Sequence, residues 1–129
     1  MDESILLINP PVVRPCEPPA GIARLLGTLN EHGVRCRVLD ANLEGMMDLL
    51  ESPATAADTW SRRAASHRDS NLSALRHTDL YRKTDRYGRA VREINHLLDM
   101  AGRPFGVQVG LANYQDETLS PLRLSLIHI

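Results

Sequence analysis

Residues 4–40 carry the feature that most constrains the fold: an apolar segment, a proline-rich loop, a helix and a second apolar segment. The run SILLIN at 4–9 is typical of a strand covered on both faces of a parallel sheet. Pro10 and Pro11 end this strand, because proline has no N–H to donate to a neighbouring strand. The loop that follows is longer than a simple reversal needs, which indicates that its shape matters.

The predicted helix after the loop has clear signals at both ends. Pro18 and Pro19 suit its entry, where a missing N–H leaves no hydrogen bond unmade, and Gly33 suits a left-handed cap at its exit. The alternating segment VRCRVLD at 34–40 predicts a second strand. We therefore predict a βαβ unit with parallel strands and a right-handed crossover. Apolar residues recur at helical spacing along the helix, at Ile22, Leu25, Leu26 and Leu29.

A helical insertion and a third strand are predicted next. Residues 43–52 predict a short amphipathic helix, and residues 105–115 alternate in polarity and predict a third strand of the same sheet. The fold class is therefore α/β, an incomplete Rossmann-like or flavodoxin-like parallel sheet that starts with a βαβ unit and carries a helical insertion. So few strands leave the sheet under-covered. The insertion spans residues 53–104, with helices at about 56–67 (opened by a capping box from Thr55 to Asp58), 71–76 and 85–101.

Composition excludes several classes of partner. The chain has 129 residues, enough for one domain, with 43% hydrophobic residues and a net charge of −1. We expect neither nucleic acid nor a membrane as a partner, and the N-terminus lacks a signal-peptide pattern, so a cytoplasmic location is expected. Cys16 and Cys36 lack the spacing of metal ligands, so no metal site is expected.

Other side chains of the insertion are expected to be structural. Its arginines and lysines are interleaved with aspartates, which favours a solvated surface of mixed charge over a nucleic-acid surface. Trp60 is expected to pack on a neighbouring helix. Four histidines are expected at the surface or at helix ends, with no partner spacing: His32, His67, His77 and His96.

The last six residues, LSLIHI at 124–129, form an apolar segment without a cap, turn or charge. They resemble the translation of a common transposase-based sequencing adapter. We therefore expect residues 124–129 to be an artefact, and residues 1–123 to be the partial domain at the start of a longer protein. A genuine C-terminal strand is the alternative.

Polar residues after each predicted strand indicate a ligand site. In an open parallel sheet, ligands bind beyond the carboxyl ends of the strands, where the loop 9–21 and the segment 40–42 begin. The prolines restrict the loop before binding, and Gly21 lets a ligand or a neighbouring loop approach the helix entry. The helix N-terminus adds free N–H groups and a partial positive charge. No catalytic residue is predicted; the candidate binding residues are Asn9, Pro10, Pro11, Pro18, Pro19, Gly21, Asp40, Asn42 and Asn113.

Structural roles remain open for the same residues. Asn9 can close the turn after its strand, Gly21 can serve packing between helix and strand, and Asp40 can cap the following helix. Pro18 and Pro19 can serve only as helix entry.

Four motifs keep their order and spacing along the first strands and helix: Ile5–Pro11, Pro18–Ile22, Glu31–Gly33 and Val38–Asp40. Together they resemble the start of the cobalamin-binding domain that precedes the catalytic barrel in cobalamin-dependent radical SAM proteins. LANYQDETLSP at 111–121 is similar to a subgroup of these proteins.

The resemblance implies a parent enzyme, of methyltransferase type or related, that uses a [4Fe–4S] cluster and S-adenosylmethionine together with cobalamin. The cluster motif CxxxCxxC is absent from this sequence, as is DxHxxG, so the chain is not expected to catalyse by itself. The implied partners are a corrinoid or other small-molecule ligand and the missing C-terminal barrel.

Two other classes stay open. A nucleotide- or nucleotide-sugar-binding Rossmann-like domain would want GxGxxG in the first turn, where this chain has prolines. A free-standing, non-catalytic α/β module, such as a receiver domain, would want acidic residues where Asn9 and Asn113 stand.

Overall fold

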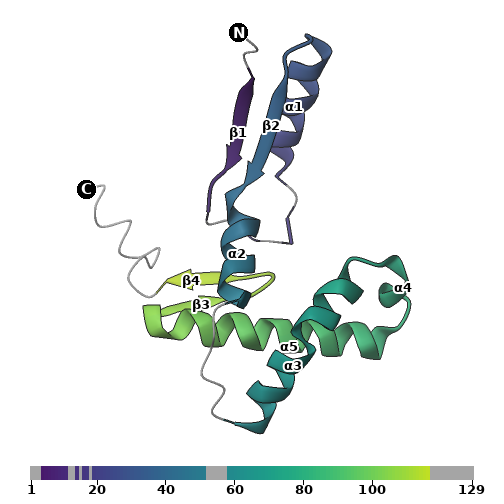
Figure 1. The fold of residues 1–129 in the computed structure, drawn as a ribbon, viewed down its shortest axis with the longest axis vertical. Coiled ribbons are helices and arrows are strands. Elements are labelled where there is room, and N and C mark those ends of the chain that lie inside the picture. The colour runs from purple at the N-terminus through teal and green to yellow at the C-terminus, as the bar shows by residue number, and fades with distance from the viewer. Residues whose placement is uncertain (1–3, 12–13, 15, 18, 52–57, 117–129) are drawn as a thin grey trace, which may run out of the picture.

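The computed structural model describes residues 4–11, 14, 16–17, 19–51 and 58–116, and it is a mixed α/β structure (Figure 1). Pro18, Thr55 and residues 124–129 therefore lie outside the described part of the chain. The elements are β1 (Ile5–Asn9), α1 (Ala20–Glu31), β2 (Cys36–Asp40), α2 (Ala41–Glu51), α3 (Thr59–Leu75), α4 (Thr78–Tyr81), α5 (Thr84–Gly102), the 3₁₀ turn η1 (Arg103–Phe105), β3 (Val107–Val109) and β4 (Tyr114–Asp116).

The predicted βαβ unit is present. β1 and β2 pair in parallel, with Ile5 opposite Cys36 and Asn9 opposite Asp40, and α1 connects the two strands. Gly33 takes the left-handed conformation that the helix exit requires, at φ 71°. The α/β fold class and its βαβ start are thus confirmed, and the two strands end side by side.

The expected third strand is wrong in its extent and in its sheet. β3 and β4 pair antiparallel with each other, and they form a sheet separate from that of β1 and β2. The chain reverses between them, where the Gly110 N–H donates to the Asn113 carbonyl over 2.8 Å. Alternation in polarity continues through this turn, which is why the sequence suggested a single strand.

α3 runs without a break where two helices were expected. Its second half is rich in serine and asparagine, which favour turns over helix interiors. A tertiary contact offsets that preference, because Asn71 Nδ2 donates to the Glu93 carboxylate of α5, while the Ser70 hydroxyl donates to the His67 carbonyl of its own helix. Asp58 is the N-cap of α3, since its carboxylate accepts from Ser61 N. α5 lies where the apolar periodicity placed it.

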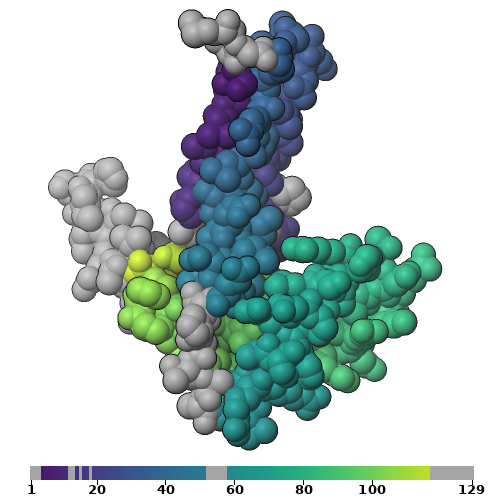
Figure 2. All heavy atoms as spheres, in the orientation of Figure 1, coloured from purple at the N-terminus to yellow at the C-terminus, as the bar shows by residue number. Residues whose placement is uncertain are grey.

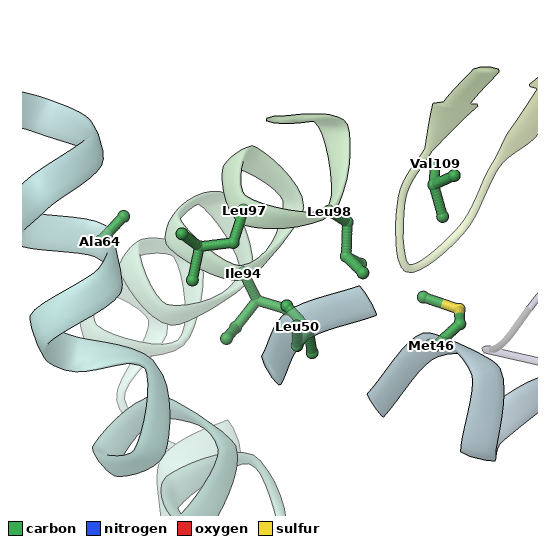
Figure 3. Packing of buried hydrophobic residues seen from close by; sticks show 7 residues of the cluster. All are labelled: Met46, Leu50, Ala64, Ile94, Leu97, Leu98 and Val109. Carbon is green, nitrogen blue, oxygen red and sulfur yellow. The ribbon is translucent and has the colours of Figure 1, made fainter. Parts of the chain in front are cut away.

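The core lies between α2, α3, α5 and β3. Figure 3 shows Leu98 of α5 facing Met46 of α2 and Val109 of β3, while Ala64 of α3 lies on the other side of α5's apolar row. Leu98 and Ile94 are 0% exposed. Strand β3 and the helices α2, α3 and α5 therefore share one apolar cluster, made of Met46, Leu50, Ala64, Ile94, Leu97, Leu98 and Val109.

The parallel strands lie outside this core. Figure 2 shows β1, α1 and β2 projecting away from the packed helices, and no residue of α1 is buried. The under-covered sheet predicted from the small number of strands is present. Its large exposed side chains include Ile5, Leu6, Ile8, Val38 and Leu39. Within the described residues, none of the helices has the length and apolar character to cross a membrane.

Candidate functional site

The carboxyl ends of β1 and β2 bring two of the predicted residues into contact. Asn9 and Asp40 are register partners in the parallel pair, and Asn9 Nδ2 donates to Asp40 Oδ1 over 3.0 Å. Asn9 is only 9% exposed, so this bond also satisfies a polar side chain that is largely withdrawn from water. The register of the strands therefore builds a fixed polar pair at the rim.

Asp40 has a structural role as well. Its Oδ1 also accepts from the Leu43 backbone N–H over 3.0 Å, which caps the first turn of α2. Both bonds use Oδ1, so Oδ2 has no partner among the described residues. Asn42, in the same turn, is buried and engaged with a partner. The cap leaves one carboxylate oxygen of Asp40 able to accept from a ligand.

The entry of α1 presents free backbone donors. Pro19 is its N-cap residue, no side chain caps this end, and the Pro19 carbonyl accepts from Ala23 N over 3.0 Å. A Cβ built on Gly21 meets no atom within 4 Å, so packing against the neighbouring loop or β2 does not require a glycine at this position. The space beside Gly21 is open to a ligand. Pro10 and Pro11 follow β1 directly and are exposed.

The turn between β3 and β4 lies beside the loop even though β3 is in another sheet. Cys16 N donates to the Leu111 carbonyl over 3.1 Å, and Leu111 N donates to Asn95 Oδ1 over 2.7 Å. Asn113 is exposed on this turn, two residues beyond the contact. The structure thus holds the turn against the loop, while no described bond joins the Asn113 side chain to Asn9 or Asp40.

A polar cluster between α3 and α5 was not predicted. Glu93 is 1% exposed, and its carboxylate accepts from Asn71 Nδ2 at 2.6 Å and lies 3.1 Å from His67 Nδ1. Arg63 Nε lies 3.9 Å from the same carboxylate. These three α3 residues are spaced four apart, so they share one helix face, and Glu93 falls on the apolar face of α5. That spacing was the signal in the sequence.

A second cluster joins the start of α3 to α5. Ser61 Oγ lies 2.9 Å from Asp58 Oδ2 and 2.9 Å from His96 Nε2, and the Trp60 and His96 rings lie 5.5 Å apart. His67 and His96, for which the sequence shows no partner spacing, thus each contact a polar residue of the facing helix. Trp60 is 41% exposed and packs only in part.

The Asp58–Ser61–His96 arrangement does not activate the serine. The Asp58 carboxylate can only accept, so the Ser61 hydroxyl donates to it and His96 Nε2–H donates to Ser61 Oγ. The imidazole is then not a base toward this hydroxyl. The Ser61 backbone N–H, followed by its hydroxyl, holds the pKa of Asp58 below its usual value. The cluster fixes the start of α3 against α5.

No family model, curated protein or solved structure gives a significant match to this chain. Among the described residues, no three histidine, cysteine or acidic side chains are grouped so that they could hold a metal ion. Function is therefore inferred from the residues and their geometry.

Proposed function

We propose that this chain is the N-terminal part of a radical SAM enzyme and contributes a cobalamin-binding, Rossmann-like domain without catalysing the reaction by itself. The observation that carries the proposal is the β1–α1–β2 unit, whose parallel strands end in the bonded pair Asn9 and Asp40. This is where open α/β sheets bind their ligands. A cytoplasmic location belongs to the same proposal.

The groups at the rim suit the amide-bearing edge of a corrinoid. Asp40 Oδ2 is available as an acceptor, and the uncapped start of α1 offers backbone donors. The described histidines lie at the end of α1 and on or beside α3 to α5, and none makes a described hydrogen bond to Asn9 or Asp40. Cobalamin would therefore be held here by hydrogen bonds to its side chains, and it would supply methyl-transfer or related chemistry to the parent enzyme.

The iron–sulfur cluster does not fit this chain. A [4Fe–4S] cluster is held by cysteine thiolates, whereas the sequence has two cysteines, Cys16 in the loop and Cys36 at the start of β2. The cluster and S-adenosylmethionine therefore belong to the proposed downstream barrel. The apolar faces of β1 and β2 have the character of a sheet that further strands and helices of the parent would cover.

Cobalamin binding can be tested with a variant that leaves the fold alone. Asp40→Asn keeps the Oδ1 acceptor for Asn9 and Leu43 but replaces Oδ2 with a donor. We expect hydroxocobalamin, followed by absorption spectroscopy and equilibrium dialysis, to bind the wild-type chain and to bind this variant about tenfold more weakly. Glu31→Gln, at the far end of α1, removes the same charge and should change nothing. Equal affinity of all three proteins, or no binding, contradicts the proposal.

The parent enzyme can be tested on its gene. The source DNA should be sequenced through the codons of residues 119–129. We expect the gene to encode other residues in place of LSLIHI and to continue in frame into a segment that encodes CxxxCxxC. A stop codon after Ile129 would favour a free-standing module. Tight binding of a nucleotide in place of cobalamin would favour the nucleotide-binding alternative.

A further inference from the structure

A hollow of about 350 Å³ opens where the end of α3, the short helix α4 and the start of α5 meet. These elements lie together, away from the strand ends (Figure 1). Leu80 forms a buried base, and the other lining residues are small or polar. The hollow is therefore a site distinct from the rim of β1 and β2. It is lined by Ser70, Ser73, Ala74, His77, Asp79, Leu80, Lys83 and Arg86.

Two cations on this wall have no partner among the described residues. Lys83 and Arg86 are exposed, and no hydrogen bond or ion pair engages either side chain within the described residues. By contrast, Arg103 and Arg68 elsewhere are paired with Asp99 and Asp69. Asp79 also lines the hollow, yet it forms no ion pair with either cation. The two positive charges are left available to a ligand.

The lining includes the Ser73 hydroxyl of α3 and two residues at the start of α5. The Ser73 hydroxyl makes no bond to a described residue, whereas the Ser70 hydroxyl already donates to the His67 carbonyl. Lys83 is the N-cap of α5 and makes no side-chain cap, so N–H groups of the first turn of this long helix remain free. Asp85 in that turn carries the opposing charge. The positive end of the helix dipole adds to the charge of Lys83 and Arg86.

We propose that this hollow binds the phosphoryl group of a small, soluble phosphomonoester. A phosphoryl group carries close to two negative charges and accepts several hydrogen bonds, which matches two free cations, a free hydroxyl and backbone donors. The interleaved aspartates make a long polyanion a poor occupant of the same surface. The site does not depend on cobalamin binding at the strand ends.

The test is a titration of the full chain with inorganic phosphate at constant ionic strength, followed by amide NMR. We expect saturable shifts at Thr84, Asp85 and Ser73, and the same shifts with ribose 5-phosphate. The paired variant Lys83→Gln with Arg86→Gln should lower the affinity about tenfold, because two exposed charge contacts are lost. Lys83→Arg, which keeps the charge, should retain the wild-type affinity for phosphate.

A matched control removes the same charge elsewhere. Arg24→Gln with Arg37→Gln alters exposed arginines on α1 and on β2, neither of which lines the hollow, and should leave the phosphate affinity unchanged. Equal weakening by both double variants, or equal shifts with chloride, would mean non-specific attraction and overturn the proposal. Absence of shifts overturns it too. Binding to phosphatidate vesicles without binding to ribose 5-phosphate would assign the site to a lipid headgroup and overturn the soluble ligand.

Discussion

The strand unit (β1, α1 and β2) and the helical unit (α2 to α5 with β3) both contain periodic apolar patterns but have opposite degrees of burial. Ile94 and Leu98 in the helical unit are 0% exposed, whereas Leu6 and Ile8 in the strand unit are 53% and 52% exposed. An apolar pattern alone therefore does not determine how far an element is buried, which depends on the number of elements packed against it. A parallel sheet needs cover on both faces, which two strands and one helix do not provide.

The two units also differ in how they treat polar groups. The helical unit buries Glu93 and Ser61 at its helix interface and satisfies both. Among the described residues, no buried side-chain nitrogen or oxygen lacks a hydrogen-bond partner. The strand unit gathers its polar pair at one end, and Asp40 keeps an oxygen free. Polar side chains whose hydrogen bonds are all made within the protein are typical of a structural role. An acceptor without a partner at the edge of a sheet is suited to binding a ligand.

Truncating an apolar side chain is expected to give the largest difference in stability between the two units. Leu98→Ala should lower the free energy of unfolding by about 2–5 kcal/mol, because it removes buried methyl groups and leaves a cavity. Ile8→Ala, on an exposed strand, should cost less than about 1 kcal/mol. Urea unfolding followed by circular dichroism measures both. Similar losses at the two positions would show that the strand unit is covered in solution, for instance by a second copy.

A smaller loss is expected at the buried carboxylate. Glu93→Ala leaves Asn71 and His67 without their acceptor and should cost about 1–3 kcal/mol in the same unfolding measurement. Glu93→Gln keeps an acceptor oxygen and the side-chain volume, so it should cost clearly less. If Glu93→Ala stabilised the protein, burial of the carboxylate would outweigh its hydrogen bonds.

Much of this fold follows from local sequence signals. The prolines before α1 and Gly33 after it mark the βαβ unit, and the apolar spacing over 85–101 predicts α5 to within a residue at each end. The hairpin was missed because Leu111 continues the alternation of β3 through the turn. The unbroken α3 was missed because its contact with Glu93 is tertiary, and local propensity does not register it.

The candidate site could also be predicted only in part from the sequence. Parallel pairing places the last residues of two strands side by side, so contact between Asn9 and Asp40 follows from the pattern. The contact between Cys16 and Leu111 does not, because it joins a loop to a hairpin of another sheet. The network around Glu93 also depends on how α3 and α5 are oriented, which the sequence shows only as two helix faces.

Substitutions at two glycines test how closely each unit is packed. A Cβ at Gly102 would lie 2.5 Å from the Val107 carbonyl oxygen, so Gly102→Ala should destabilise the helical unit by about 1–3 kcal/mol. Gly21 has no neighbour within 4 Å, so Gly21→Ala should be neutral or stabilise α1 by up to about 1 kcal/mol. Urea unfolding measures the two effects. A loss of stability at Gly21→Ala would show that a partner occupies that space.

The smallest expected effect is a pH dependence at the start of α3. Hydrogen bonds from Ser61, first from its backbone N–H, lower the pKa of Asp58 from its usual 3.8. A carboxyl group whose pKa is lower in the folded state stabilises the fold above the unfolded value, and this stabilisation is lost as the pH falls through the folded value. Asp58→Asn keeps an acceptor oxygen for Ser61 N but does not titrate.

The thermal unfolding midpoint of the wild-type protein should therefore fall more than that of Asp58→Asn between about pH 6 and about pH 3. Asp79→Asn is the matched control, because Asp79 makes no bond to a described side chain and should keep the wild-type slope. Asp69 also has a lowered pKa, caused by its hydrogen bond to Arg68, so part of the acid loss persists in every variant. Identical slopes for the wild type and Asp58→Asn would mean that the cap at Asp58 does not hold α3 against α5, and that the packing of the helical unit alone sets its stability.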